Sequence, residues 1–143
     1  MQRTASAQWS GGLKDGKGSV ATQSGILSDT PYSFTTRFEG AKGTNPEELI
    51  AAAHAGCFTM ALSAQLGTMN FTPQSLRTTA TLSFEKLEAG WTISRIHLDV
   101  AGRVPGISAE AFQNAAQSAK ANCPVSRALK AEITMNASLE QAA

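Results

Sequence analysis

The chain contains two cysteines, Cys57 and Cys123, whose sulfurs could act as nucleophiles. Cys57 lies on an apolar stripe at helical spacing, where a cysteine is usually an inert small hydrophobic residue. Small residues at Ala53, Ala55 and Gly56 nevertheless leave room beside this sulfur for a substrate or another element. Position alone therefore does not decide between packing and catalysis at Cys57.

Cys123 directly precedes Pro124, a residue suited to the first turn of a helix. The backbone amides of that turn could stabilise a thiolate, although a buried cysteine at the end of an alanine-rich face is an equally good interpretation. If Cys57 and Cys123 meet in the folded chain, they could cycle between dithiol and disulfide. Catalysis, redox sensing, metal binding and simple packing all stay open for the pair.

Three more side chains could take part in chemistry around Cys57. His54 could be a base or half of a metal pair with Cys57, but no second pair has metal-ligand spacing, so a partly exposed structural histidine is favoured. Arg37, expected at a strand end, and Glu47, in a first helical turn, could form an ion pair whose positive charge stabilises a thiolate. In the plainer interpretation, Glu47 caps the helix and Arg37 is exposed to solvent.

The polar and apolar pattern predicts a scaffold of mixed helices and strands for these residues. A long helix should begin at Asn45-Pro46-Glu47, where a capping residue, a proline and an acid coincide, and end near Gly67. Its core-facing stripe should hold Ala53, Gly56, Cys57, Met60 and Ala64. Other elements are expected over residues 19–27 and 32–38 (strands), 76–87 and 91–100 (a hairpin), 108–123 and 125–130 (helices), and 133–139 (a strand). The expected fold class is α+β, with helices on a largely antiparallel sheet.

Length and composition limit the range of functions. A chain of 143 residues with 42% hydrophobic composition fits one domain over residues 1–143. The formal net charge of +1 comes with scattered Lys and Arg, which argues against nucleic acid as a partner. We expect no membrane span, and residues 1–9 lack the hydrophobic region of a signal peptide, so a cytoplasmic location is expected. No glycine-rich phosphate loop or serine nucleophile elbow is present in the sequence.

Three segments of the sequence contain family motifs, and they run from Arg37 to Gly40, from Gly43 to Phe58 and from Ala121 to Ser126. Together these segments resemble the OsmC/Ohr family, the osmotically inducible and organic-hydroperoxide-resistance proteins. The resemblance extends over essentially the whole chain and includes the Val104-Pro105-Gly106-Ile107 break. His54 and the tryptophan-bearing start favour the OsmC branch over the Ohr branch.

The resemblance implies a thiol-dependent peroxidase built as an intertwined homodimer with a long central helix. Cys57 would attack an organic hydroperoxide, Cys123 would resolve the resulting sulfenic acid as a disulfide, and Arg37 with Glu47 would activate Cys57. It also implies a dithiol reductant of the lipoyl type and no metal, haem or flavin. The alternative of a different class is a non-enzymatic thiol redox sensor or ligand-binding module that uses the same cysteine pair.

Helix geometry gives one expectation about the homodimer. Glu47 and Cys57 lie ten residues apart on the predicted helix, which separates their backbones by about 15 Å along its axis. An antiparallel pairing of this helix with its copy would bring Glu47 of one chain towards Cys57 of the other. We therefore expect Arg37 and Glu47 to act on the partner's Cys57, the competing view being that Arg37 bridges within one chain.

Overall fold

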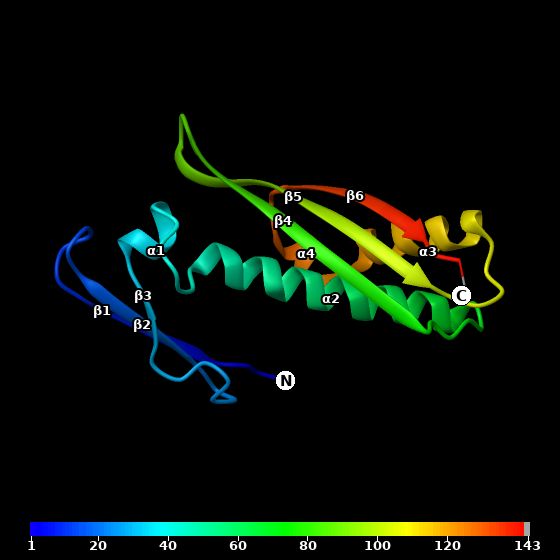
Figure 1. The fold of residues 1–143 in the computed structure, drawn as a ribbon, viewed down its shortest axis with the longest axis horizontal. Coiled ribbons are helices and arrows are strands. Elements are labelled where there is room, and N and C mark those ends of the chain that lie inside the picture. Colours follow the sequence, from blue (N-terminus) through cyan, green and yellow to red (C-terminus); the bar gives the residue numbers. More distant parts are fainter. Residues whose placement is uncertain (142–143) are drawn as a thin grey trace. The chain divides into compact units, whose positions relative to one another are not determined.

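The computed structural model describes residues 1–141 (Figure 1). The chain divides into two compact units, residues 1–49 and the residues from Ile50 onward, and each is described by itself. The long helix α2, Pro46–Thr68, begins in the first unit and continues in the second. That the chain forms a single domain stays a prediction.

The first unit contains a three-stranded antiparallel sheet. Its strands β1 (Ala5–Ser10), β2 (Lys17–Thr22) and β3 (Thr30–Tyr32) lie in sequence order. Trp9 and Tyr32 pack on this sheet with ring centroids 5.5 Å apart. Gly18 lies beneath both rings, because a Cβ there would come within 2.6 Å of the Tyr32 ring. The close approach of two aromatic rings thus requires glycine in β2.

A short helix, α1 (Phe34–Phe38), follows β3, whereas the sequence predicted a strand over residues 32–38. That prediction was wrong because a reciprocal cap at Ser33 and Thr36 sets the backbone locally. The Ser33 hydroxyl accepts from the Thr36 N–H, and the Ser33 N–H donates to the Thr36 hydroxyl at 2.9 Å. Arg37 therefore lies on a helix and not at the end of a strand.

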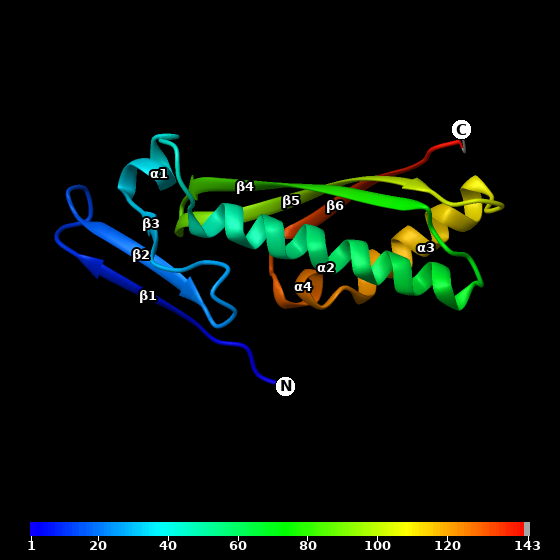
Figure 2. The ribbon, with the colours of Figure 1, turned by 60° about the horizontal axis from the view of Figure 1, so that its bottom comes forward.

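The second unit packs helices on one face of a three-stranded sheet (Figure 2). β4 (Ser75–Leu87) pairs antiparallel with β5 (Gly90–Arg103), and β6 (Glu132–Leu139) pairs parallel with β5. Between β5 and β6 the chain forms α3 (Ala109–Asn122) and α4 (Pro124–Ala128). The predicted α+β class is confirmed. The parallel pairing of β6 was not foreseen, because it depends on where the crossover through α3 and α4 returns the chain.

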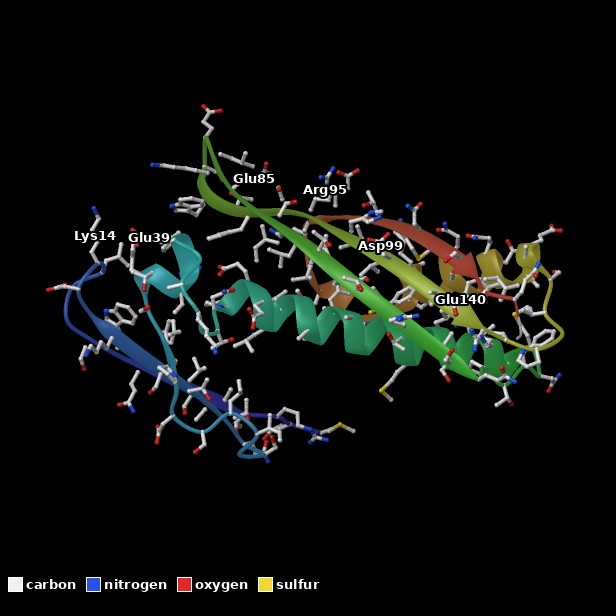
Figure 3. The ribbon with its side chains drawn as sticks, in the orientation of Figure 1. Lys14, Glu39, Glu85, Arg95, Asp99 and Glu140 are labelled. Carbon is white, nitrogen blue, oxygen red and sulfur yellow. The ribbon has the colours of Figure 1, made fainter. Side chains whose placement is uncertain are left out.

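The two faces of β5 differ in polarity. Ile96, Leu98 and Val100 are buried beneath the helices, whereas Arg95 and Asp99 are exposed (Figure 3). The same core contains Phe112, Ala116 and Ala119 on one face of α3 and Cys123 at its end. The helical layer is thereby fixed against the sheet through apolar contacts.

The buried face of α2 differs from the predicted one. His54, Phe58, Leu62 and Leu66 are fully buried, spaced four residues apart. Of the predicted stripe, Cys57 is half-buried, and the other members are exposed on the far side of the helix: Ala53, Gly56, Met60 and Ala64. The prediction failed because α2 is apolar on all sides, so the sequence pattern does not identify the face that packs on the sheet.

Within the described residues, α2 is also the one helix long and apolar enough to cross a membrane, with a mean hydropathy of 1.4. The expectation that the chain has no membrane span stays a prediction. By length and composition alone this is weak evidence, because core helices of soluble proteins pass the same test. It does show that α2 has more apolar surface than its own chain covers.

Candidate active site

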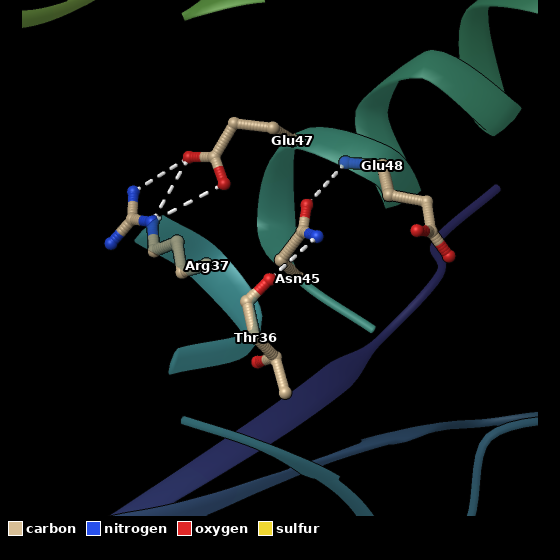
Figure 4. Close-up of polar contacts among 5 residues, drawn as sticks. All are labelled: Thr36, Arg37, Asn45, Glu47 and Glu48. Carbon is tan, nitrogen blue, oxygen red and sulfur yellow. Dashed lines mark hydrogen bonds and ion pairs between the residues drawn. The ribbon is translucent and has the colours of Figure 1, made fainter. Parts of the chain in front are cut away.

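In the first unit, Arg37 and Glu47 form a bidentate ion pair (Figure 4). The guanidinium donates from Nη2 to Oε1 at 2.7 Å and from Nε to both carboxylate oxygens at 3.1 and 3.2 Å. The Glu47 side chain is 11% exposed and the Arg37 side chain 35%. A fork of this kind fixes the guanidinium plane while part of the cation stays accessible.

Asn45 brings this pair together. Its side-chain oxygen accepts from the Glu48 N–H at 2.8 Å and so caps α2, while its Nδ2 donates to the Thr36 carbonyl at 3.2 Å on α1 (Figure 4). One amide therefore ties the start of α2 to the turn of α1 that bears Arg37. The sequence predicted the capping role but not the second contact.

An aromatic pocket of about 210 Å³ lies beside Arg37. Phe34 and Phe38 pack at 4.8 Å between ring centroids, and the guanidinium lies 5.3 Å from the Phe38 ring centre. The complete lining comprises Trp9, Leu13, Tyr32, Ser33, Phe34, Arg37 and Phe38. The pocket thus combines one cation with a mostly apolar wall. Sequence reasoning missed it because α1, which supplies three of these residues, was not predicted.

In the second unit, the two cysteines are in contact. The sulfurs of Cys57 on α2 and Cys123, between α3 and α4, lie 3.3 Å apart, and both residues are free thiols. Cys123 is fully buried and Cys57 is partly exposed. A disulfide requires sulfurs about 2.05 Å apart, so a small movement would join them. The hypothesis that the pair meets in the fold is consistent with this geometry.

The surroundings of the two sulfurs favour opposite charge states. Burial raises the pKa of the Cys57 thiol, and the neighbouring Cys123 raises it further against one opposing backbone hydrogen bond from Val125. Burial also opposes ionisation of Cys123, but hydrogen bonds outweigh it and lower the pKa of Cys123. They come from the backbone of Ser126, the Cys57 thiol, the Ser126 hydroxyl and the backbone of Val125. Within this unit the negative charge is therefore better placed on Cys123.

His54 is fully buried, which corrects the expectation of a partly exposed histidine. Its Nε2 lies 2.6 Å from the Ser126 hydroxyl on α4. Burial lowers the pKa of His54, so the ring is neutral near pH 7. The Cys-Pro-Val-Ser spacing places Ser126 one turn beyond Cys123, and that spacing is the signal that could have identified it.

The predicted site residues thus form two groups, Arg37 with Glu47 and Cys57 with Cys123. Among the described residues no cluster of three or more histidine, cysteine or acidic side chains is suited to hold a metal ion. The arrangement provides a dithiol in one unit and a fixed cation beside an apolar pocket in the other.

The sequence has close relatives of known family. Residues 39–138 match the family described as OsmC-like protein. Proteins named Peroxiredoxin OsmC from Escherichia coli (strain K12) and Shigella flexneri are each 54% identical to this chain over 140 residues, covering 98% of it and 98% of each relative.

Solved structures share the fold. The organic hydroperoxide resistance protein OhrB of Bacillus subtilis matches with a TM-score of 0.68 at 26% identity, covering 96% of this chain and 98% of that one. An OsmC-like protein of unknown function from Vibrio cholerae O1 matches with a TM-score of 0.76 at 14% identity, covering 96% and 99%. The second likeness is one of fold alone.

Proposed function

Because this chain belongs to the OsmC-like protein family, and because its two thiols lie in contact, we propose that it reduces organic hydroperoxides to alcohols through a Cys57–Cys123 disulfide. Relatives named Peroxiredoxin OsmC at 54% identity make it a cysteine-based peroxidase with a role in peroxide detoxification, and they confirm the predicted OsmC branch. The single observation that carries the proposed mechanism is the 3.3 Å separation of the two sulfurs.

Access supports the attacking role that we propose for Cys57. A peroxide must reach the sulfur, and Cys123 is fully buried whereas Cys57 is partly exposed. Cys57 nevertheless has a raised pKa, so its thiol is mostly protonated at neutral pH. Attack at a useful rate therefore needs a nearby cation that favours the Cys57 thiolate.

The proposed reaction has three steps. The Cys57 thiolate attacks the distal oxygen of the hydroperoxide, the O–O bond breaks, and the alkoxide takes a proton and leaves as the alcohol. Cys123 then attacks the sulfur of the Cys57 sulfenic acid, so that the S–S bond forms, the S–O bond breaks and hydroxide leaves to become water. An external dithiol, which we expect to be of the lipoyl type, reduces the disulfide and is itself oxidised.

Arg37 is the proposed cation, held in orientation by Glu47, and we propose that it acts on Cys57 of a second copy. Within one α2 helix, ten residues separate the backbones of Glu47 and Cys57 by about 15 Å. An antiparallel pair of α2 helices related by a twofold axis would bring the two positions together.

The exposed face of α2 supports the homodimer. Ala53, Gly56, Met60 and Ala64 form an apolar stripe on the side of α2 opposite the buried residues, with Met60 76% exposed. A Cβ added at Gly56 would meet nothing within 4 Å, so small size is not required there by the chain's own packing. A second α2 helix that approaches closely would bury this stripe, and the close approach would explain its small residues.

The aromatic pocket beside Arg37 supports an organic substrate. Each methylene buried in an apolar pocket is worth about 0.8 kcal/mol, a gain that hydrogen peroxide lacks. We therefore expect bulky hydroperoxides to be reduced faster than hydrogen peroxide. A cytoplasmic location and activity without metal, haem or flavin stay predictions.

Steady-state turnover tests the proposal. The reduced protein is supplied with dihydrolipoamide and cumene hydroperoxide, and the alcohol formed per chain is measured, with Cys57→Ser as the control. We expect many turnovers per chain and none above background in the control. A single stoichiometric oxidation that the dithiol does not reverse would instead support the redox sensor, and no loss of thiols would exclude both roles.

A further inference from the structure

The peroxidase mechanism leaves one buried polar group unused. His54 is fully buried on α2, a helix whose other fully buried side chains are apolar. Burying an imidazole costs free energy unless it is hydrogen-bonded, and its Nε2 meets the Ser126 hydroxyl at 2.6 Å. Ser126 lies three residues after Cys123, and hydrogen bonds from its backbone and its hydroxyl lower the pKa of Cys123. A continuous polar chain thus runs from His54 through Ser126 to the sulfur of Cys123.

The burial of the His54 ring favours one donor-to-acceptor direction for these hydrogen bonds. Among the described residues Nδ1 of His54 has no hydrogen-bond partner. A proton on Nδ1 would bury an unpaired N–H donor, which is rarer in proteins than an unfilled acceptor. With the proton on Nε2, the ring donates to the Ser126 oxygen, and the single hydroxyl proton of Ser126 remains to donate to Cys123. A sulfur that accepts such a hydrogen bond is stabilised as the thiolate.

We propose that His54 and Ser126 are positioning residues that hold Cys123 as a thiolate aimed at Cys57. The inference rests on the proposed function, in which Cys123 attacks the Cys57 sulfenic acid, and it assigns two residues to that resolving step. His54 orients the Ser126 hydroxyl, and Ser126 stabilises the nucleophile. Neither residue touches the hydroperoxide.

Other ionisable groups near Cys123 or Ser126 are kept unchanged in the test. Cys57 contacts Cys123 from α2, and Lys120 on α3 and Arg127 on α4 line a pocket of about 370 Å³ together with Ser126. Both cations are retained in every variant below. Differences among the variants then report on His54 and Ser126.

The first measurement needs no peroxide. In the Cys57→Ser chain Cys123 is the one remaining thiol, and its thiolate absorbance is followed against pH. We expect His54→Leu and Ser126→Ala to shift the titration to higher pH, and His54→Gln and Ser126→Thr, which retain a donor, to shift it less.

The matched control is His97→Leu, because the His97 Nδ1 also lies 2.6 Å from a hydroxyl, that of Thr134. Curves for His54→Leu and Ser126→Ala that coincide with their parent would overturn the inference.

The second measurement follows a single turnover with both cysteines present. Ser126→Ala should slow the conversion of sulfenic acid to disulfide by about tenfold at pH 7. It should not slow the first oxidation of Cys57, because a neutral Cys123 no longer opposes a negative charge on Cys57. Ser126→Ala removes one oxygen and carries the test if His54→Leu does not fold. An unchanged conversion rate would overturn the inference. Failure of the wild-type chain to react with hydroperoxide would overturn the proposed function, and the titration of Cys123 would still be read independently.

Discussion

At the scale of single residues, the two thiols differ in their access to solvent and in their acidity. Cys57 can be reached but is a poor acid, and Cys123 is the better acid but is buried. A peroxidase needs a thiolate that can be reached, so an added positive charge at Cys57 is the missing requirement. Arg37, oriented by the Glu47 fork, is suited to supply it.

Replacing Arg37 by methionine should therefore reduce peroxide reduction at neutral pH by at least about tenfold, because the pKa of Cys57 rises when a neighbouring cation is lost. Activity should partly return as pH increases and Cys57 ionises without help. The measurement is a pH profile of initial oxidation rate, with the equally charged Arg37→Lys as the comparison. An equal loss at every pH would show that Arg37 positions substrate or supports the fold instead.

His54 should make stability depend on pH. Burial lowers the pKa of His54, whereas in the unfolded chain a histidine has a pKa of about 6.5. The unfolded chain then binds more protons at acidic pH, so stability is fully present above about pH 6.5 and is lost as pH falls below it. Urea unfolding at a series of pH values should show a steeper loss for wild type than for His54→Gln. Equal slopes for the two proteins would contradict a neutral buried His54.

At the scale of elements, α2 bears both Glu47 and Cys57, and its two faces differ in burial. One face, with Phe58, Leu62 and Leu66, packs in the core, and the opposite face is apolar but exposed. A helix that is apolar all round is normally buried all round. We therefore interpret the exposed face as the surface that pairs with a second copy.

Gly56→Leu tests this interpretation. The isolated chain has open space at that position, and leucine is favoured over glycine in a helix by roughly 0.5–1 kcal/mol, so the single chain should fold normally. A bulky side chain in a closely packed helix pair should instead weaken the dimer. Sedimentation of the wild type, Gly56→Leu and an exposed control on α3, Asn114→Leu, measures this. A Gly56→Leu protein that is as dimeric as wild type would argue against pairing through this face.

The elements also show what the sequence could and could not predict. The start of α2 was predicted because its signals, a capping residue, a proline and an acid, are local. The helix α1 was missed because Phe-Thr-Thr-Arg-Phe is rich in strand-forming residues and only the Ser33–Thr36 cap turns it into a helix. The buried face of α2 depends on packing against β5, which no periodicity in an apolar helix reveals.

At the scale of the whole molecule, we propose that the site is complete only when two copies combine. The family motif predicted Arg37, Glu47, Cys57 and Cys123 as site residues, and the structure brings them together in two pairs. Ser126 and the aromatic pocket were not predicted as parts of a site. Ser126 meets His54, which is distant in sequence, and the pocket depends on α1, which was not predicted.

Mixed dimers test the sharing of the site. Chains with Cys57→Ser are refolded with an equal amount of chains that carry Arg37→Ala and Glu47→Ala. In the mixed dimer one site then combines an intact Cys57 with an intact pair from the other chain, so we expect activity that neither parent has. A mixed dimer that forms but stays inactive would support the competing view, in which Arg37 serves Cys57 of its own chain.

The central claim, that a hydroperoxide is reduced through Cys57 and a Cys57–Cys123 disulfide, is tested most directly by mass spectrometry after one equivalent of cumene hydroperoxide. We predict that the wild-type chain loses both of its thiols and yields a peptide pair joined through Cys57 and Cys123, and that Cys123→Ser gains oxygen on Cys57. An unmodified Cys57 in the Cys123→Ser chain, or a wild-type chain that consumes peroxide while both thiols stay free, would contradict the account.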